Sequence, residues 1–204
     1  MNRIITIGRE FGSGGRELGR RLSEKLQCAY YDQEIITEIA KRTSMSDEYV
    51  RQIVENRPIV SYPIQVGHSF FPLNNPMLQQ SVSIHTEQHK LLQELSDKSD
   101  CIIVGRCADY ILREKNPFRI FVYAPQEKKL ARCMAHRPEG EELTEAQMKK
   151  KIAELDRKRA KYYEFFSGQK WGAKENYDLT INTNGGDIKK MSEALYNYLQ
   201  TLFA

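Results

Sequence analysis

Residues 3–17 read RIITIGREFGSGGRE, and this stretch indicates the architecture of the whole chain. Its first part, Arg3–Ile7, is rich in β-branched side chains and is predicted to form a buried strand. Leucines recur at every fourth position of Arg16–Gln27, which is the spacing of the buried face of a helix. The glycines between these segments therefore lie in a turn that joins a strand to a helix.

Four further segments have the apolar composition of strands. They are Cys28–Tyr31, Cys101–Val104, Phe118–Tyr123 and Tyr177–Thr183. Helical patterns lie between or after them, at 33–42, 46–56, 77–97, 144–166 and from Ile188 onward. Strands that alternate with helices imply a parallel sheet connected by crossover helices. We therefore predict an α/β fold with about five parallel strands flanked by helices.

The 204-residue chain has the composition of an ordinary globular protein, with 40% hydrophobic and 28% charged residues. No apolar run approaches the ~20 residues that cross a bilayer. Met1-Asn2-Arg3 leads straight into a strand-like segment, without the pattern of a leader peptide. We therefore expect a cytoplasmic protein with no membrane partner. The four cysteines form no Cys-x-x-Cys pair, so neither a zinc site nor a disulfide framework is predicted.

Positive charge is concentrated in two segments, although the net charge of the chain is only +4. Residues 1–27 carry six basic and three acidic groups, and residues 148–161 carry seven basic and two acidic groups. The rest of the chain is therefore acidic in balance. This distribution favours a local anionic ligand, and no nucleic-acid partner is expected.

The glycine-rich turn is similar to a phosphate-binding loop but departs from its standard pattern, G-x-x-x-x-G-K-[ST]. Counted back from Gly14, Arg9 stands at the first glycine and Gly15 at the lysine. Arg16 and Glu17 follow, where a hydroxyl would face magnesium. The amides of such a turn still suit an anion, and the alternative is a tight turn whose glycines serve packing alone. Arg9 and Arg16 are the local candidates to replace the lysine.

Several short motifs follow one another along almost the whole chain. They are Gly12-Ser13-Gly14, Asp32 at 17 residues after Gly15, Gly105-Arg106 after a strand, Asp156-Arg157-Lys158-Arg159, and the tail Tyr162-Tyr163 through Trp171-Gly172 to Asn176-Tyr177-Asp178-Leu179. In these respects the chain resembles the cytidylate kinase-like proteins, divergent P-loop relatives of bacterial cytidylate kinase. In that subgroup the lysine-free loop is usual.

The resemblance implies a three-layer P-loop kinase fold. Its core would comprise residues 1–39, 98–136 and 175–204, with an acceptor-binding insertion at about 40–97 and a lid at about 137–174. The implied activity is that of a nucleoside monophosphate kinase, which transfers the γ-phosphoryl group of ATP to CMP or dCMP with Mg²⁺. The alternative is a nucleotide- or phosphate-binding protein of the same fold without kinase turnover, because the loop lysine is absent.

The resemblance also implies the residues of the site. ATP would be bound by Gly12, Ser13, Gly14, Gly15, Arg16 and Glu17. The acceptor nucleotide would be bound by Asp32, Arg106, Asp156 and Arg159. Catalysis would fall to Arg16, Arg9, Arg159 and Asp32. Val104 stands where the well-studied enzymes carry a carboxylate near magnesium, so the metal is expected at Asp32, with Asp109, Glu17 or water-mediated ligation as alternatives.

Other residues have plain structural interpretations. Asp32 suits the cap of the helix that follows it. His85 and His89 lie four residues apart but lack a third ligand, which favours a solvent-facing pair over a zinc site. The aromatic run at 162–166 is expected to be a packing seam. The apolar, proline-rich stretch Pro58–Pro76 suits a subunit contact as well as a substrate pocket, so a homo-oligomer is an open alternative.

Overall fold

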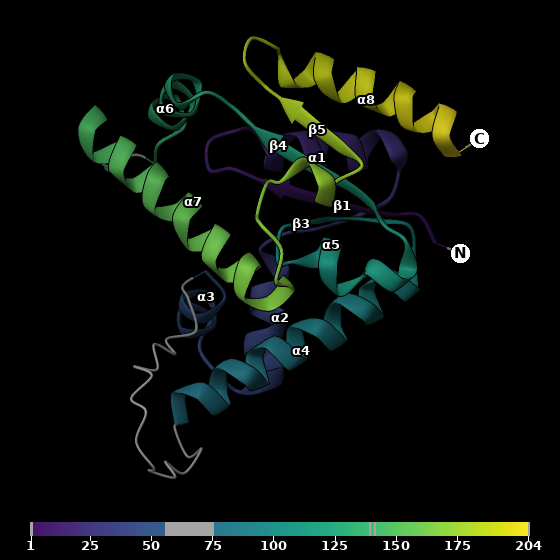
Figure 1. Cartoon of the computed structure of the whole chain (residues 1–204), viewed down its shortest axis with the longest axis vertical. Coiled ribbons are helices and arrows are strands. Elements are labelled where there is room, and N and C mark those ends of the chain that lie inside the picture. Colours follow the sequence, from purple (N-terminus) through teal and green to yellow (C-terminus); the bar gives the residue numbers. More distant parts are fainter. Residues whose placement is uncertain (1, 56–75, 139, 141, 204) are drawn as a thin grey trace.

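The computed structural model describes residues 2–55, 76–138, 140 and 142–203. Five parallel strands form one sheet in the order β2-β3-β1-β4-β5, with helices on both of its faces (Figure 1). The strands are β1 (Ile4–Arg9), β2 (Ala29–Tyr31), β3 (Cys101–Val104), β4 (Phe118–Tyr123) and β5 (Leu179–Asn182). The predicted α/β fold with a five-stranded parallel sheet is thus confirmed.

Helices connect the strands as crossovers, and a further helix, α8, follows the last strand. They are α1 (Gly15–Leu26), α2 (Glu34–Thr43), α3 (Asp47–Glu55), α4 (Pro76–Lys98), α5 (Ala108–Ile111), α6 (Gln126–Ala135), α7 (Glu145–Ser167) and α8 (Ile188–Phe203), with short 3₁₀ turns η1 (Arg113–Lys115) and η2 (Lys174–Asn176). The helix α2 begins after Gln33, which is its N-cap residue. Asp32 therefore does not cap this helix, and its buried side chain is used elsewhere.

The central strand β1 sends alternate side chains into two hydrophobic cores. Ile4 belongs to the core that the sheet shares with α2, α3, α4, α5 and the end of α7. Ile5 and Ile7 belong to the core between the sheet and the helices α1 and α8. This alternation follows from the two-residue period of a strand, and it gives the molecule its three layers.

The long helix α7 joins two packing regions. Thr144 caps its start in a reciprocal pair with Gln147, and Gly168 ends it with a φ of 67°. Its first half packs against α6 through Met148, while its second half enters the main core through Tyr162. Part of the predicted lid is thus anchored in the core. The division into core, insertion and lid stays a prediction.

The aromatic run at the end of α7 forms the expected packing seam except at Phe165, whose side chain is exposed. The position of His85 differs from the expectation. Tyr162 is buried, and its ring centroid lies 4.7 Å from that of Phe166. His85 of α4 does not face solvent: its half-buried ring stacks on Phe166 at 3.7 Å. Burial, with His89 as a lesser cause, lowers the pKa of His85 to about 4. The two histidines therefore have different surroundings.

Two other expectations concern surfaces. Of the apolar stretch Pro58–Pro76, every residue before Pro76 lies outside the described part of the chain. Among the described residues, no helix is both long enough and apolar enough to span a bilayer.

Candidate functional site

The turn after β1 has a shape that requires glycine at two positions. Gly12 and Gly14 have φ values of 77° and 84°, in the left-handed region. A Cβ atom on Gly12 would lie 2.9 Å from the carbonyl oxygen of Lys129, and one on Gly14 would lie 2.9 Å from Cδ1 of Ile188. The loop is therefore pressed between α6 and α8, with no room for side chains.

Ser13 holds the loop from inside. Its hydroxyl donates to the carbonyl of Glu10 at 2.8 Å, and the hydroxyl of Thr183 donates to the carbonyl of Ser13 at 2.7 Å. Gly14 is the N-cap of α1 and has no side chain to cap the helix, and the amide of Gly15 donates a long hydrogen bond, 3.4 Å, to the hydroxyl of Ser13. The first amides of α1, including that of Arg16, have no acceptor in their own helix. The loop thus offers fixed N–H dipoles to an anion.

A buried lysine that sequence analysis missed supports the loop from α6. The ammonium of Lys129 lies 3.0 Å from a carboxylate oxygen of Glu10 and 3.0 Å from one of Asp156. Asp156 also accepts the amide N–H of Phe11 at 2.6 Å. Burial lowers the pKa of Lys129, but the two hydrogen-bonded carboxylates outweigh it, so the pKa is raised. Contact of Asp156 with a nucleotide stays a prediction, since both its oxygens are engaged within the protein.

Five predicted site residues meet at the carboxyl edge of the sheet. Arg9 ends β1, Asp32 follows β2, Arg106 follows β3, Arg16 lies in α1 and Arg159 reaches in from α7. Asp32 lies 2.5 Å from Nε of Arg16 and 3.5 Å from Nη2 of Arg9. Arg159 donates to the carbonyl of Arg9 at 3.4 Å. Parallel strands end at one edge of a sheet, which is why such distant residues come together.

This cluster contains more positive than negative charge. Burial lowers the pKa of Arg9 to about 9, and Arg159, Arg106 and Arg16 act in the same direction. Asp32 alone opposes them. A guanidinium stays protonated at neutral pH, so these cations repel one another in a partly buried place. A bound anion would relieve that repulsion.

The backbone that carries Arg106 is unusual. Gly105, Arg106 and Cys107 have φ values of 73°, 60° and 56°, three left-handed residues in a row. Gln88 of α4, fully buried, donates from Nε2 to the carbonyl of Arg106 at 2.9 Å and to the hydroxyl of Tyr162 at 3.1 Å. Sequence analysis missed Gln88, because a glutamine on a polar helix gives no signal of burial.

Two pockets open onto this edge of the sheet. One, of about 520 Å³, lies over the loop between α1, α6 and α7, and its lining includes the cations Arg132 and Lys151. Its size suits a small organic ligand. The other is narrower and much smaller, about 50 Å³, and lies over the ends of β1 and β3. Arg9 and Arg159 line both pockets.

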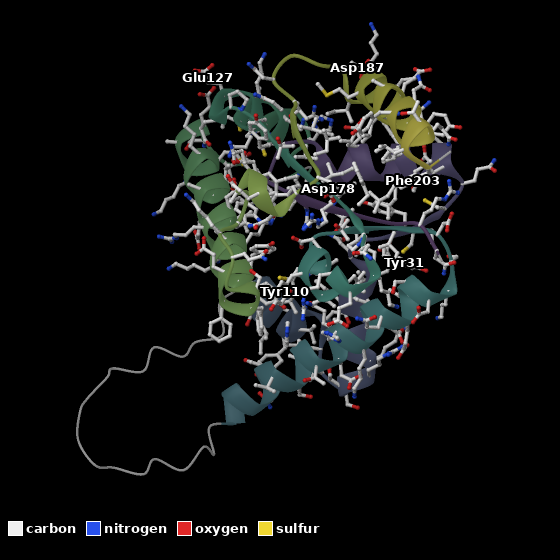
Figure 2. All side chains as sticks on the ribbon, turned by 45° about the vertical axis from the view of Figure 1, so that its right-hand side comes forward. Tyr31, Tyr110, Glu127, Asp178, Asp187 and Phe203 are labelled. Atoms are coloured by element: carbon white, nitrogen blue, oxygen red, sulfur yellow. The ribbon has the colours of Figure 1, made fainter. Side chains whose placement is uncertain are left out.

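The narrower pocket combines Arg106 with aromatic walls. Trp171, Tyr177 and Asp109 line it. Burial raises the pKa of Asp109, although this carboxyl accepts the Tyr163 hydroxyl at 2.7 Å. Asp178 (Figure 2) ties the segment next to Tyr177 to the sheet. Its carboxylate accepts hydrogen bonds from the side chain and the backbone amide of Arg119 in β4. The tail motif thus has a structural basis next to the pocket.

The carboxylates proposed for magnesium do not fit a metal site held by the protein. Asp32 lies between two guanidinium groups, which repel a cation. Glu17 pairs with two arginines, and Asp109 is engaged by a tyrosine. Across the described ranges there is no group of three or more histidine, cysteine, aspartate or glutamate residues suited to a metal ion.

Comparison with known proteins places these features in a family. The sequence profile of the Cytidylate kinase-like family matches residues 4–185. A solved structure of an uncharacterized protein from Eubacterium ventriosum is similar, with a TM-score of 0.69 and 24% identity over 97% of this chain and 98% of that one. No curated protein matches the sequence.

Two kinases of known type share the fold. Shikimate kinase from Acinetobacter baumannii, solved in complex with shikimate, has a TM-score of 0.54 and 18% identity over 98% of this chain and 94% of its own. Deoxyadenosine kinase from M. mycoides, solved with the products dCMP and a flexible dCDP, has a TM-score of 0.50 and 15% identity over 97% and 99%. At these identities the likeness shows the P-loop kinase fold alone.

Proposed function

We propose that this chain, which belongs to the cytidylate kinase-like family, is a nucleoside monophosphate kinase that transfers the γ-phosphoryl group of ATP to CMP or dCMP. The observation that carries the proposal is the meeting of two pockets at Arg9 and Arg159. Phosphoryl transfer needs a donor and an acceptor that face each other across a concentration of positive charge. The family supports the choice of a cytidine nucleotide.

ATP would occupy the pocket over the loop. The amides of Gly12–Glu17 and the start of α1 would hold its phosphates, and Arg132 and Lys151 would add charge from α6 and α7. Magnesium would arrive bound to the ATP phosphates as part of the substrate, since Asp32 and Glu17 are already paired with arginines. Asp156 and Lys129 would keep the loop in shape.

CMP would bind at the narrower pocket, which must widen from its volume of about 50 Å³ to admit a whole nucleotide. Arg106 would bind its phosphate with the two-point geometry that a guanidinium provides. Trp171 and Tyr177 would face its ring system. Gln88 would hold the backbone of Arg106 in its left-handed conformation. The acceptor phosphate would thereby point toward Arg9 and Arg159.

In the reaction, an oxygen of the acceptor phosphate attacks the γ-phosphorus of ATP. The bond between that phosphorus and the bridging oxygen breaks, and its electron pair stays on the departing ADP. The charge spreads over the transferring oxygens, where cations stabilise it. Arg9 and Arg159 are the cations placed between the two pockets. An ionised phosphate needs no base to remove a proton.

A product assay tests the proposal. The purified chain is incubated with Mg-ATP and, separately, CMP, dCMP, UMP, AMP and GMP, and the nucleotides are separated by ion-exchange chromatography. We expect equal amounts of ADP and of CDP or dCDP, with CMP or dCMP preferred. Arg20→Ala is a matched control, because Arg20 is exposed and pairs only with Glu24 within the described structure. The absence of any diphosphate product above an enzyme-free control would refute the proposal.

The second candidate is a nucleotide-binding protein of the same fold without turnover. Gly15 and Val104 favour it, because they stand where active relatives carry a lysine and a carboxylate. Calorimetry with ATP and with CMP separates the candidates. Binding without product supports the second candidate, and the absence of binding by either nucleotide rules out both.

A further inference from the structure

We infer that Arg9 and Gly15 are an exchanged pair: the loop cation has moved from the helix side of the loop to the end of β1, and Gly15 leaves the space that this cation needs. The inference rests on the proposed function, since it assigns Arg9 as a catalytic residue of phosphoryl transfer. A standard loop has glycine at the first of these positions and lysine at the second. This chain has the reverse order.

Space at Gly15 carries the first part of the argument. A Cβ atom on Gly15 would lie 2.7 Å from Cβ of Arg9 and 3.1 Å from Cβ of Val122. Gly15 is buried and is absent from the described residues with positive φ, so its backbone would accept a side chain. The position is therefore restricted by its neighbours, and the nearest of them is Arg9.

The direction of the Arg9 side chain carries the second part. A Cβ atom on Gly105 would overlap the guanidinium of Arg9, so this group lies over the end of β3. The Arg9 side chain is 12% exposed and lines both pockets. Two glycines thus make room for one arginine: Gly15 beside its stem and Gly105 beside its charge.

The charge on Arg9 is available to a phosphate. Among the described residues its guanidinium donates no hydrogen bond to the protein, and its nearest carboxylate, Asp32, lies 3.5 Å away. The other oxygen of Asp32 is held by Arg16 at 2.5 Å. The Arg16 side chain is 54% exposed and lines only the pocket over the loop. Arg16 therefore positions Asp32, while Arg9 faces the point where the two substrates would meet.

Four variants test the exchange: Arg9→Met, Arg9→Gly, Gly15→Lys and the double variant R9G/G15K. Methionine keeps the volume of the arginine stem and removes its charge, so R9M reports on charge in a folded protein. We expect R9M to lower kcat by about 100-fold or more, as the loss of a transition-state donor does. R9M should leave the melting temperature close to that of the wild type.

The double variant restores the standard order of glycine and lysine. We expect Gly15→Lys alone to lower the melting temperature by about 5 °C or more, because the new side chain meets Arg9. The double variant should recover most of that loss and should exceed the kcat of R9G by about tenfold or more. The exchange is refuted if R9M keeps a kcat within about threefold of the wild type, or if G15K is as stable alone as with R9G.

The four variants can fail or succeed independently of the proposed kinase activity. If the wild-type chain makes no diphosphate product, the proposed function fails. The stability cycle of R9G, G15K and R9G/G15K still judges whether the two positions share one space, and calorimetry with Mg-ATP still judges the charge. Weaker ATP binding by R9M than by Arg20→Met supports a phosphate contact, and equal binding by the two variants refutes it.

Discussion

The pocket over the loop and the narrower pocket are built in different ways, although Arg9 and Arg159 line both. The first is formed by backbone amides and by cations from helices, held in place by buried ion pairs such as Lys129 with Asp156. The second is formed by aromatic and buried polar side chains around Arg106. Under the proposed function, the first pocket would recognise phosphates generally, whereas the second would select the acceptor.

The largest effect that would distinguish the two pockets is expected from a substitution of Arg106. Arg106→Met should lower kcat/KM for CMP by about 100-fold or more, because a bidentate phosphate contact is lost. The affinity for ATP, measured by calorimetry, should stay unchanged. Arg113→Met is the matched control, since Arg113 is half-exposed and lies outside both pockets. An equal loss of ATP affinity in R106M would mean that the two pockets are not functionally separate.

At the pocket over the loop, Lys129→Met should lower both the stability of the fold and the affinity for ATP. It leaves Glu10 and Asp156 without their shared cation, and breaking a buried ion pair costs about 3 kcal/mol of unfolding free energy. Urea unfolding measures this loss, and ATP affinity should fall with it. The neighbouring Lys128 is exposed, so Lys128→Met is the control. Equal stability of the two variants would contradict the supporting role of Lys129.

Gln88 offers a finer test of the narrower pocket. Gln88→Leu removes the hydrogen bond to the carbonyl of Arg106, so KM for CMP should rise by about tenfold while KM for ATP stays constant. Gln93 lies on the same helix and donates to the carbonyl of Ile111 instead, which makes Gln93→Leu the control. If both variants raise the two KM values alike, Gln88 supports the helix and does not position Arg106.

The smallest effect concerns the contact between α4 and α7 beside the narrower pocket. The pKa of His85 is lowered to about 4 in the folded chain, so the unfolded chain binds more protons between pH 4 and 6.5. Stability should therefore fall as pH falls through this window, by about 1.5 kcal/mol between pH 6.5 and 5 from this residue. Urea unfolding at several pH values measures it, and His85→Phe should flatten the slope. An unchanged slope in that variant would contradict the burial of His85.

Features that depend on local sequence patterns could be predicted from the sequence. The loop, its helix and the five-stranded parallel sheet follow from one contiguous motif and from apolar periodicity, so the fold class and the position of the glycine-rich loop were predictable, whereas the strand order was not. Arg9, Asp32, Arg106 and Arg159 were named from short motifs, and the parallel sheet brings them together.

The supports of the site were not predictable. Lys129 lies more than a hundred residues from Glu10 in sequence, and Gln88 looks like any polar residue of a long helix. Sequence also suggested Asp32 as a helix cap and as a metal ligand, whereas the fold places it between two arginines. Such pairings arise from tertiary packing, which local patterns do not encode.

The most direct measurement is the affinity of adenosine and cytidine joined by five phosphates, since one molecule can fill both pockets only if they meet at Arg9 and Arg159. Calorimetry should give a dissociation constant at least ~100-fold below that of ATP, because the second half binds without a second loss of translational freedom. The Arg9→Met variant should lose most of this gain. A wild-type affinity no higher than that for ATP would show that the two pockets do not form one site.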